Sequence, residues 1–292
     1  MPESLRIGAV AYLNTRPLVY GLEHASAPGL ELSYDVPAVL AGKMQHGELD
    51  VALLPVIELA RIPSLEVVPG LGIVTRGPAR SVLLVARRPL DRLRRVALDP
   101  ESRTSNALFR VLCRDVWRID PQIVEPPAGT PRAPALAAAL DDCDAVVRIG
   151  DKALFEQIPA GCHSEDLGEA WTRATGLPFV WAAWIARPGA VERTLYRALH
   201  DSRRAGVKAI DEIAAEYSWN GARHAELARS YLLEHIRYRL GSAELDGLTA
   251  FLRAAADAGI IDAAPTIRSA LRRFTDRDAV VGPTDRLEET AR

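Results

Sequence analysis

The sequence predicts a mixed α/β protein with two lobes and a helical C-terminal region. Short apolar segments alternate with helical stretches twice along the chain, once in residues 5–68 and again in residues 95–149, and this alternation is typical of α/β units. Two extended apolar segments, 81–86 and 179–186, stand before and after the second unit. We expect the chain to cross to a second lobe at the first of them and to return at the other.

The first unit begins with a strand and then a helix. Pro17 suits the first turn of a helix, where its missing N–H costs nothing, and Gly47 suits a helix end. The expected elements, in chain order, are a strand at 5–10, a helix at 17–23, a strand at 30–36, a helix at 39–46, and strands at 51–54 and 65–68.

The second unit repeats the alternation, and helices follow it. Its expected elements are a strand at 95–98, a helix at 104–117, a strand at 122–124, a helix at 133–140 and a strand at 145–149. After Pro188, apolar residues recur three and four positions apart, which indicates amphipathic helices. The expected division is a first lobe of residues 1–86 and 187–280, a second lobe of residues 87–186, and a flexible tail at 281–292. A ligand of such a protein lies in the cleft between the lobes.

Composition and charge exclude several classes of protein. The 292 residues are 48% hydrophobic and 25% charged, as in soluble globular proteins. Because 36 Lys and Arg oppose 38 Asp and Glu, no overall positive field attracts nucleic acid or an anionic membrane. No apolar run reaches the length of a membrane helix and no export signal is recognisable, so we expect a cytoplasmic protein with a small-molecule partner. The oligomeric state is not indicated.

The sequence also lacks the common cofactor and metal motifs. It contains no GxGxxG motif, no P-loop, no GxSxG elbow and no HExxH pair. Its three cysteines have no CxxC spacing, and an odd number does not form a disulfide framework. We therefore expect neither a cofactor nor a metal ion.

Asn14 is the first candidate ligand-binding residue. It lies between the first expected strand and the helix that begins at Pro17, and such loops carry the ligand groups of open α/β sheets. Its amide can donate to an oxygen and accept from a hydroxyl. Capping of the following helix by Asn14 or Thr15 explains the spacing equally well.

Thr104, Ser105 and Asn106 form a second candidate site, with Ser102 beside them. They crowd the start of a helix, where free backbone N–H groups and the helix dipole attract a carboxylate or phosphate. One capping residue would satisfy the helix. The surplus of hydroxyl groups therefore favours an anion site.

Gly150 and Asp151 follow the buried strand at 145–149. Gly150 lets a ligand approach the backbone closely. Asp151 can accept from a ligand hydroxyl, although capping of the next helix is the favoured interpretation. Ser81 begins the first extended segment, and its position alone indicates a structural role.

Six segments together resemble one known family. They are AYLNTRPL (11–18), GELDVALLPVIELAR (47–61), GPARSVLL (77–84), LDPESRTSNAL (98–108), RIGDKAL (148–154) and DLGEAWTRATGLPFVWAAW (166–184). In this order they are similar to the MqnA family, the chorismate dehydratases of the futalosine route to menaquinone, over residues 6–187. The resemblance implies a fold like that of type II periplasmic binding proteins, and removal of water from chorismate to give 3-[(1-carboxyvinyl)oxy]benzoate.

The resemblance also implies roles for the candidate residues. The implied catalytic residues are Asn14 and Ser81, and the implied substrate-binding residues are Thr104, Ser105, Asn106, Gly150 and Asp151. Leu54, Pro55 and Val56 depart from a stretch that is often Ser-rich in the family, which puts a contact from that loop in question. Arg148 stands where an apolar residue is expected, and it either adds a cation to the site or points away.

The implied reaction needs placement more than acid strength, because loss of a proton and of hydroxide makes the ring aromatic. The motifs supply no evident His, Lys or Glu base, although Asp151 is a candidate. We therefore expect the substrate's own side-chain carboxylate to take the ring proton. Helix N-terminal donors would hold the ring carboxylate, and Asn14 would contact the departing hydroxyl.

Other functions share the expected fold. The sister enzyme of the same pathway, which forms a dihydroxynaphthoate, is expected to carry a Pro-Cys-Pro-Asn-Asp type loop near its start, and that loop is missing here. A solute-binding protein would capture a carboxylate without reacting, and the lack of an export signal disfavours it. A transcription-factor effector domain would follow a helix-turn-helix segment, which we do not find.

Overall fold

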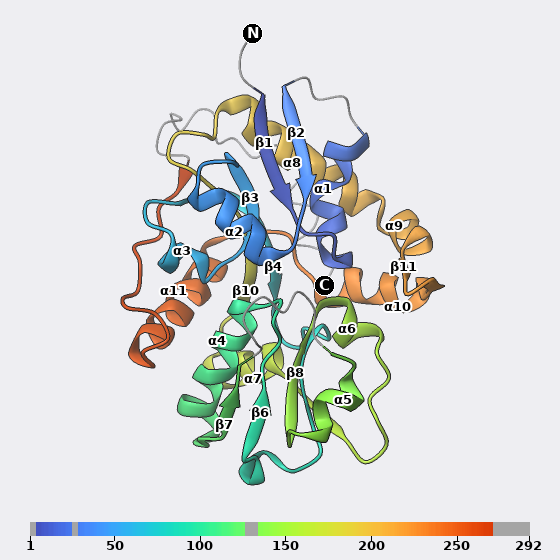
Figure 1. Cartoon of the computed structure of the whole chain (residues 1–292). Helices are drawn as coiled ribbons and strands as arrows, with labels where there is room; N and C mark the ends of the chain where they lie inside the picture. The colour runs from blue at the N-terminus through green and yellow to red at the C-terminus, as the bar shows by residue number, and fades with distance from the viewer. Residues whose placement is uncertain (1–3, 25–28, 126–133, 271–292) are drawn as a thin grey trace.

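The computed structural model describes residues 4–24, 29–125 and 134–270. These residues form two lobes, each built on a five-stranded sheet (Figure 1). The flexible tail expected at 281–292 lies outside the described residues. In the part of the chain that the structure describes, no helix is both long and apolar enough to cross a bilayer.

The first lobe contains a mixed sheet with strand order β2, β1, β3, β10, β4. β1 runs parallel to β2 and β3, whereas β10 lies antiparallel between β3 and β4. β3 and β10 are almost fully buried, which explains their nearly continuous apolar sequences. The elements are β1 Leu5–Ala9, α1 Arg16–His24, β2 Leu30–Tyr34, α2 Pro37–Gln45, β3 Val51–Pro55, α3 Glu58–Arg61, β4 Glu66–Thr75 and β10 Phe179–Ala186.

The second lobe contains a sheet with strand order β7, β6, β8, β5, β9. β6 runs parallel to β7 and β8, and β5 lies antiparallel between β8 and β9. The elements are β5 Val82–Ala86, β6 Arg95–Ala97, α4 Arg103–Leu112, β7 Gln122–Val124, α5 Leu136–Asp141, β8 Ala145–Ile149, α6 Gly150–Phe155, β9 His163–Asp166 and α7 Leu167–Thr175.

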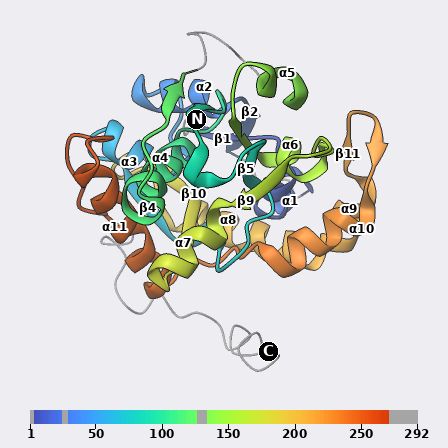
Figure 2. The same cartoon turned by 90° about the horizontal axis from the view of Figure 1, so that it is seen from below.

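The C-terminal region is helical, as expected, and packs mainly on the first lobe. α8 lies along α1, and this approach requires glycine, since a Cβ on Gly206 would lie 2.1 Å from the carbonyl oxygen of Pro17. α11 flanks the molecule on one side and α9 and α10 on the other (Figures 1 and 2). The elements are α8 Arg193–Lys208, α9 Ile210–Glu216, the unexpected hairpin β11 Ser218–Trp219 and β12 Ala222–Arg223, α10 Ala225–Ser230, the π-helical turn η4 Tyr231–His235 and α11 Ser242–Asp257.

Both crossings between the sheets come earlier in the chain than the expected boundaries after residues 86 and 186. β5 pairs with β8 and β9 and so belongs to the second sheet. β10 pairs with β3 and β4 and so belongs to the first. The chain leaves the first sheet after Thr75 and returns before Phe179. The boundaries were wrong because an extended apolar segment shows the same pattern whether it links two sheets or pairs within one.

Several element bounds also differ from the expected ones. The helix expected at 104–117 is α4 up to Leu112, followed by the π-helical turn η3 Cys113–Trp117. The strand expected at 65–68 continues to Thr75 as β4. α5 begins at Leu136, and residue 133, where its start was expected, lies outside the described residues. β9 and α7 were not expected at all.

Candidate active site

A pocket lies where the two lobes meet. It contains about 590 Å³ of space between protein atoms, a volume that includes solvent at its open mouth. The first lobe contributes Val10, Tyr12, Asn14, Pro37, Leu53, Pro55, Ile73, Trp181 and Ala182. The crossing and the second lobe contribute Ser81, Val82, Glu101, Ser102, Thr104, Ser105, Ile149 and Gly150. Most of the walls are therefore apolar, and the polar groups come mainly from a few loops.

Contacts between the lobes hold the structure around this pocket. The Arg103 guanidinium lies 3.0 Å from the Glu58 carboxylate, whose side chain is only 2% exposed. The backbone N–H of Ile57 donates to Oγ1 of Thr104 at 3.3 Å. Because Glu58 and Ile57 belong to the first lobe and Arg103 and Thr104 to α4, these contacts tie the lobes together beside the pocket.

Asn14, Tyr231 and Ser81 form a chain of hydrogen bonds at the pocket wall. Nδ2 of Asn14 donates to the Tyr231 hydroxyl at 3.1 Å, and that hydroxyl donates to Oγ of Ser81 at 2.7 Å. Oγ of Ser81 donates in turn to the carbonyl oxygen of Ala79 at 3.4 Å. A carbonyl oxygen can only accept, so the end of the chain fixes the direction of every bond in it.

The direction of this chain determines which atom of Asn14 is left for a ligand. Since Nδ2 donates to Tyr231, Oδ1 is the remaining acceptor, and it is buried without a hydrogen-bond partner among the described residues. A buried polar atom of this kind normally has a partner. Asn14 lines the pocket, so a ligand hydroxyl is a suitable partner. The capping interpretation of Asn14 is therefore not the one that its contacts favour.

Tyr231 keeps its proton in this arrangement. The residue is 2% exposed, and burial raises the pKa of its hydroxyl above the ordinary value of 10.0. A neutral phenol can donate to Ser81 and accept from Asn14 at the same time, whereas a phenolate can only accept. Burial therefore preserves the direction of the hydrogen-bond chain.

The start of α4 presents two hydroxyl donors to the pocket. Ser102 caps the helix, because its Oγ accepts from the N–H of Ser105 at 3.2 Å. Oγ of Ser105 accepts from the Ser102 hydroxyl at 2.8 Å, and Oγ1 of Thr104 accepts from the backbone of Ile57. Within the residues that the structure describes, neither Thr104 nor Ser105 donates its hydroxyl hydrogen to a protein group. Both hydrogens can point at an anion, and the helix dipole favours one there.

Asn106 does not line this pocket. Its Nδ2 donates to the carbonyl oxygen of Asp99 at 2.8 Å, and its Oδ1 accepts from the N–H of Asp99 at 3.2 Å. Both ends of the amide are thus engaged with one residue of the preceding loop. Asn106 therefore fixes the loop that leads into α4. Its position does not support the expected role in substrate binding.

Asp151 also lies behind the pocket wall instead of in it. Its Oδ1 accepts from the backbone N–H of Leu13 at 3.2 Å, and its Oδ2 accepts from the Tyr217 hydroxyl. Burial raises the pKa of Asp151 above its ordinary value, against the effect of these hydrogen bonds. The carboxyl group neither faces the cavity nor caps α6, whose N-cap is Ile149. It joins the second lobe to the turn that carries Asn14.

Gly150 does line the pocket. Its φ of 62° lies in the left-handed region, which other residues adopt with strain. Its N–H donates to the carbonyl oxygen of Ser81 at 2.8 Å. Gly150 therefore sets the path of the backbone between Ser81 and Tyr12, whose ring a Cβ on Gly150 would approach to 3.7 Å.

The structure also shows where the residues that depart from the family pattern lie relative to the pocket. Pro55 lines the pocket with apolar atoms, so the loop at Leu54, Pro55 and Val56 contacts the cavity without a hydroxyl. Arg148 does not line it: its side chain is 1% exposed, and its Nε lies 3.1 Å from Oε2 of Glu156. Of the two interpretations of Arg148, the structure supports the one in which it points away.

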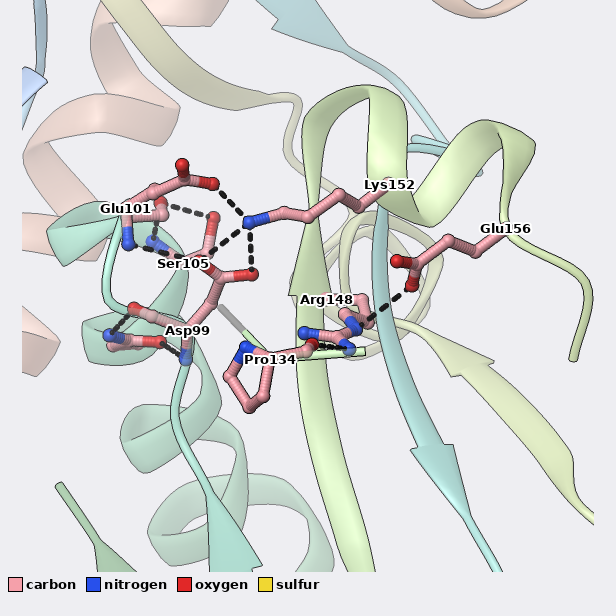
Figure 3. Close-up of polar contacts among 9 residues, drawn as sticks. Asp99, Glu101, Ser105, Pro134, Arg148, Lys152 and Glu156 are labelled. Carbon is pink, nitrogen blue, oxygen red and sulfur yellow. Dashed lines mark hydrogen bonds and ion pairs between the residues drawn. The ribbon is translucent and has the colours of Figure 1, made fainter. Parts of the chain in front are cut away.

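Two polar residues at this site were not expected from the sequence. Tyr231 does not line the pocket itself; it belongs to the amphipathic helical repeat after Pro188, and only the fold brings its hydroxyl to Asn14. Glu101 lies between the β6 strand and the Ser102 cap, where nothing in the sequence marks it as a pocket residue. Its carboxylate pairs with Nζ of Lys152 on α6 (Figure 3).

Solved structures with the same fold include proteins of diverse sequence. A protein from Archaeoglobus fulgidus, AF1704, matches with a TM-score of 0.69 and 17% identity, over 88% of this chain and 98% of that one. The alkanesulfonate-binding protein SsuA from Xanthomonas axonopodis pv. citri, bound to MOPS, matches with a TM-score of 0.57 and 17% identity, over 91% and 95% of the two chains. The expected periplasmic-binding-protein-like fold is confirmed.

Curated relatives match most of the chain in sequence. A chorismate dehydratase of Thermus thermophilus is 29% identical over 266 residues, which cover 85% of this chain and 94% of that protein. A chorismate dehydratase of Campylobacter jejuni is 26% identical over 253 residues, 85% of this chain and 96% of that one. A family model described as menaquinone biosynthesis matches residues 5–257. The chain therefore belongs to this menaquinone biosynthesis family.

Proposed function

We propose that the chain is a chorismate dehydratase, a carbon–oxygen lyase that converts chorismate to 3-[(1-carboxyvinyl)oxy]benzoate and water. The observation that carries the proposal is the arrangement of donors and acceptor around one apolar pocket. The hydroxyls of Thr104 and Ser105 are left to donate to an anion, and Oδ1 of Asn14 is left to accept from a hydroxyl. Chorismate carries both a ring carboxylate and a ring hydroxyl. The names of the curated relatives support the same activity.

The pocket walls fit a flat ring held at its two polar ends. In this proposal the ring carboxylate accepts from Thr104 and Ser105 at the start of α4, where charge-assisted hydrogen bonds are short and strong. The apolar side chains of Leu53, Ile73 and Trp181 line the same cavity and cover the ring. The ring hydroxyl lies at Asn14, which accepts its hydrogen through Oδ1 and orients it for departure.

The reaction breaks a C–H bond and a C–O bond and forms a C=C bond. The ring carbon that bears the ether side chain loses its proton, and the electron pair of that C–H bond becomes part of the aromatic ring. The neighbouring carbon loses its hydroxyl group, which combines with the proton to leave as water. Formation of the aromatic ring makes the reaction favourable. The enzyme therefore lowers the barrier largely by holding the substrate in the reactive arrangement.

We further propose that the substrate's own side-chain carboxylate takes the ring proton. Asp151, the protein base considered from the sequence, is engaged by Leu13 and Tyr217 outside the cavity. Glu101 lines the cavity, but its carboxylate is paired with Lys152. The side chain of chorismate carries its carboxylate on the ether attached to the reacting carbon, so it is close to that proton by its own connectivity.

An absorbance assay tests the proposal. Purified protein is incubated with chorismate while the ultraviolet spectrum is followed for an aromatic product. We expect product with the wild type and none with Asn14→Ala, while Asn14→Ala still binds chorismate by isothermal titration calorimetry. A wild type that binds chorismate without changing its spectrum would identify a carboxylate-binding protein of the same fold and contradict the proposal. Unchanged turnover in Asn14→Ala would remove Asn14 from the mechanism.

The proposal includes a cytoplasmic location. Cys113, Cys143 and Cys162 are all free thiols in the structure, which suits a reducing compartment. Cell fractionation of the native host, with detection by antibody, tests this part separately.

A further inference from the structure

Glu101 places a carboxylate in the wall of a pocket that is proposed to bind an anion with two carboxylates. It precedes Ser102, Thr104 and Ser105 in the loop that leads into α4, and all four residues line the pocket. A like charge at this position opposes binding of the substrate, because charges interact strongly where protein atoms exclude water. The pocket therefore needs a group that compensates for Glu101.

Lys152 is placed to compensate for it. Its Nζ pairs with the Glu101 carboxylate and lies 3.4 Å from the carboxylate of Asp99 (Figure 3). The side chains are mostly buried: Lys152 is 18% exposed, Glu101 11% and Asp99 0%. Oδ1 of Asp99 also accepts from the backbone N–H of Glu101 at 2.9 Å, so the two acids and Lys152 form a connected cluster behind the anion-binding hydroxyls.

The neighbouring cation does not take part in this compensation. Arg148 donates to the carbonyl oxygen of Pro134 and pairs with Glu156, and Figure 3 shows Lys152 directed at Glu101 and Asp99 while Arg148 and Glu156 contact each other. Lys152 follows Gly150 by two residues on α6, so the helix whose first residue lines the pocket also brings in the compensating charge.

We propose that Lys152 determines the specificity of the pocket for an anionic substrate by neutralising Glu101. The carboxylate of the substrate is then bound by the hydroxyls of Thr104 and Ser105 beside a Glu101 carboxylate that Lys152 neutralises, with Asp99 buried on the far side of Lys152. Neither Lys152 nor Glu101 contacts the reacting atoms. This inference rests on the proposed function. In this proposal Lys152 affects substrate binding only by neutralising Glu101. The KM values of the two single variants and of the double variant measure this coupling.

Kinetics with chorismate on Glu101→Gln, Lys152→Met and the double variant test the proposal. Lys152→Met should raise KM about tenfold or more with little change in kcat, because Glu101 is left unpaired. The double variant should recover most of that loss. Glu101→Gln should lower KM about threefold, because one negative charge is removed from the cluster while Lys152, still beside Asp99, keeps its positive charge. Because Glu101→Gln only removes a charge and leaves no carboxylate without its cation, we expect this variant to fold. It keeps the test informative if Lys152→Met does not fold.

Glu156→Gln is the matched control, since it removes the same charge from a carboxylate that pairs with Arg148 outside the pocket, and its KM should equal that of the wild type. A double variant with KM as high as Lys152→Met would show that Lys152 contacts the substrate directly and overturn the proposal. Loss of kcat in Glu101→Gln would identify Glu101 as a base and overturn it as well. A wild type without turnover would instead refute the proposed function, which separates the two failures.

Discussion

The hydroxyl of Tyr231 accepts a hydrogen bond from Nδ2 of Asn14 at 3.1 Å, although 217 residues separate the two in the chain. Tyr231 comes from the π-helical turn η4 in the C-terminal region, and Asn14 comes from the short turn after β1. Irregular helical turns of this kind often occur at functional sites. The contact means that the C-terminal helices do more than cover the first lobe, because they orient a side chain in the pocket.

Removal of this hydroxyl should impair turnover more than folding. In Tyr231→Phe, Nδ2 of Asn14 loses its acceptor and Ser81 loses its donor, so the amide is free to rotate. We expect kcat to fall about tenfold to a hundredfold with KM little changed, because misplaced groups mainly affect the chemical step. Steady-state kinetics measure both values.

Tyr238→Phe is the matched control for that substitution. Tyr238 is 6% exposed and its hydroxyl has no hydrogen-bond partner among the described residues. Its removal should leave kcat unchanged and leave the free energy of unfolding equal or higher. Equal losses of kcat in the two variants would show that Tyr231 acts only through packing.

Ser105→Ala should weaken substrate binding. The substitution removes a hydroxyl donor at the start of α4 while the Ser102 cap can still accept from the backbone N–H of residue 105. Loss of one charge-assisted hydrogen bond should raise KM about tenfold, as measured by initial rates over a range of chorismate concentrations. The exposed Ser164→Ala on β9 provides the comparison. A loss of kcat at unchanged KM would place Ser105 at the reacting atoms and not at the carboxylate.

Gly150→Ala should reduce both stability and activity. A φ of 62° is strained for alanine, at a cost of about 1 kcal/mol, and any relaxation moves the backbone that lines the pocket. Gly161→Ala provides a control with the same kind of strain, since its φ is 80° and a Cβ there meets no atom within 4 Å. We expect urea unfolding to show a similar decrease in the free energy of unfolding for both variants. Steady-state kinetics should show a decrease in kcat/KM for Gly150→Ala alone. Full activity in Gly150→Ala would contradict this role.

Asp151 should make the stability of the wild type depend on pH. Burial raises its pKa above the ordinary 3.8, so the folded protein holds this proton more tightly than the unfolded chain does. Its contribution to stability is complete below pH 3.8 and is lost as the pH rises through the folded pKa. Asp151→Asn does not titrate and keeps an acceptor for Leu13.

Urea unfolding of the wild type and Asp151→Asn across the acidic range measures this effect. The free energy of unfolding of the wild type, relative to the variant, should fall as the pH rises above 3.8. A difference that grows with pH would mean that hydrogen bonds from Tyr217 and Leu13 outweigh burial and lower the pKa of this carboxyl.

Much of the fold was predictable because the pattern of apolar residues reflects burial directly. The strands at 122–124, 145–149 and 179–186 have the expected bounds in the structure. The strand β9 was missed because His163–Asp166 is a polar edge strand without an apolar repeat. The crossings were misplaced because pairing between distant strands, which decides the lobe of β5 and β10, leaves no local signal.

The candidate site was predictable where its residues are close in sequence to the ends of strands. Asn14, Ser81, Thr104, Ser105 and Gly150 all line one pocket. Other parts of the site depend on contacts between distant segments. Asp151 was misinterpreted because its partner Tyr217 lies 66 residues away, and a carboxylate after a strand has the same sequence context whether it faces a ligand or another lobe.

The identity of the product tests the central claim most directly. Purified wild type is incubated with chorismate, and the product is identified by mass spectrometry and proton NMR. The account predicts a compound lighter than chorismate by one water, with the proton pattern of a 1,3-disubstituted benzene and an intact enolpyruvyl side chain. Chorismate recovered unchanged after incubation with folded protein, or an aromatic product that has lost its side chain, would contradict it.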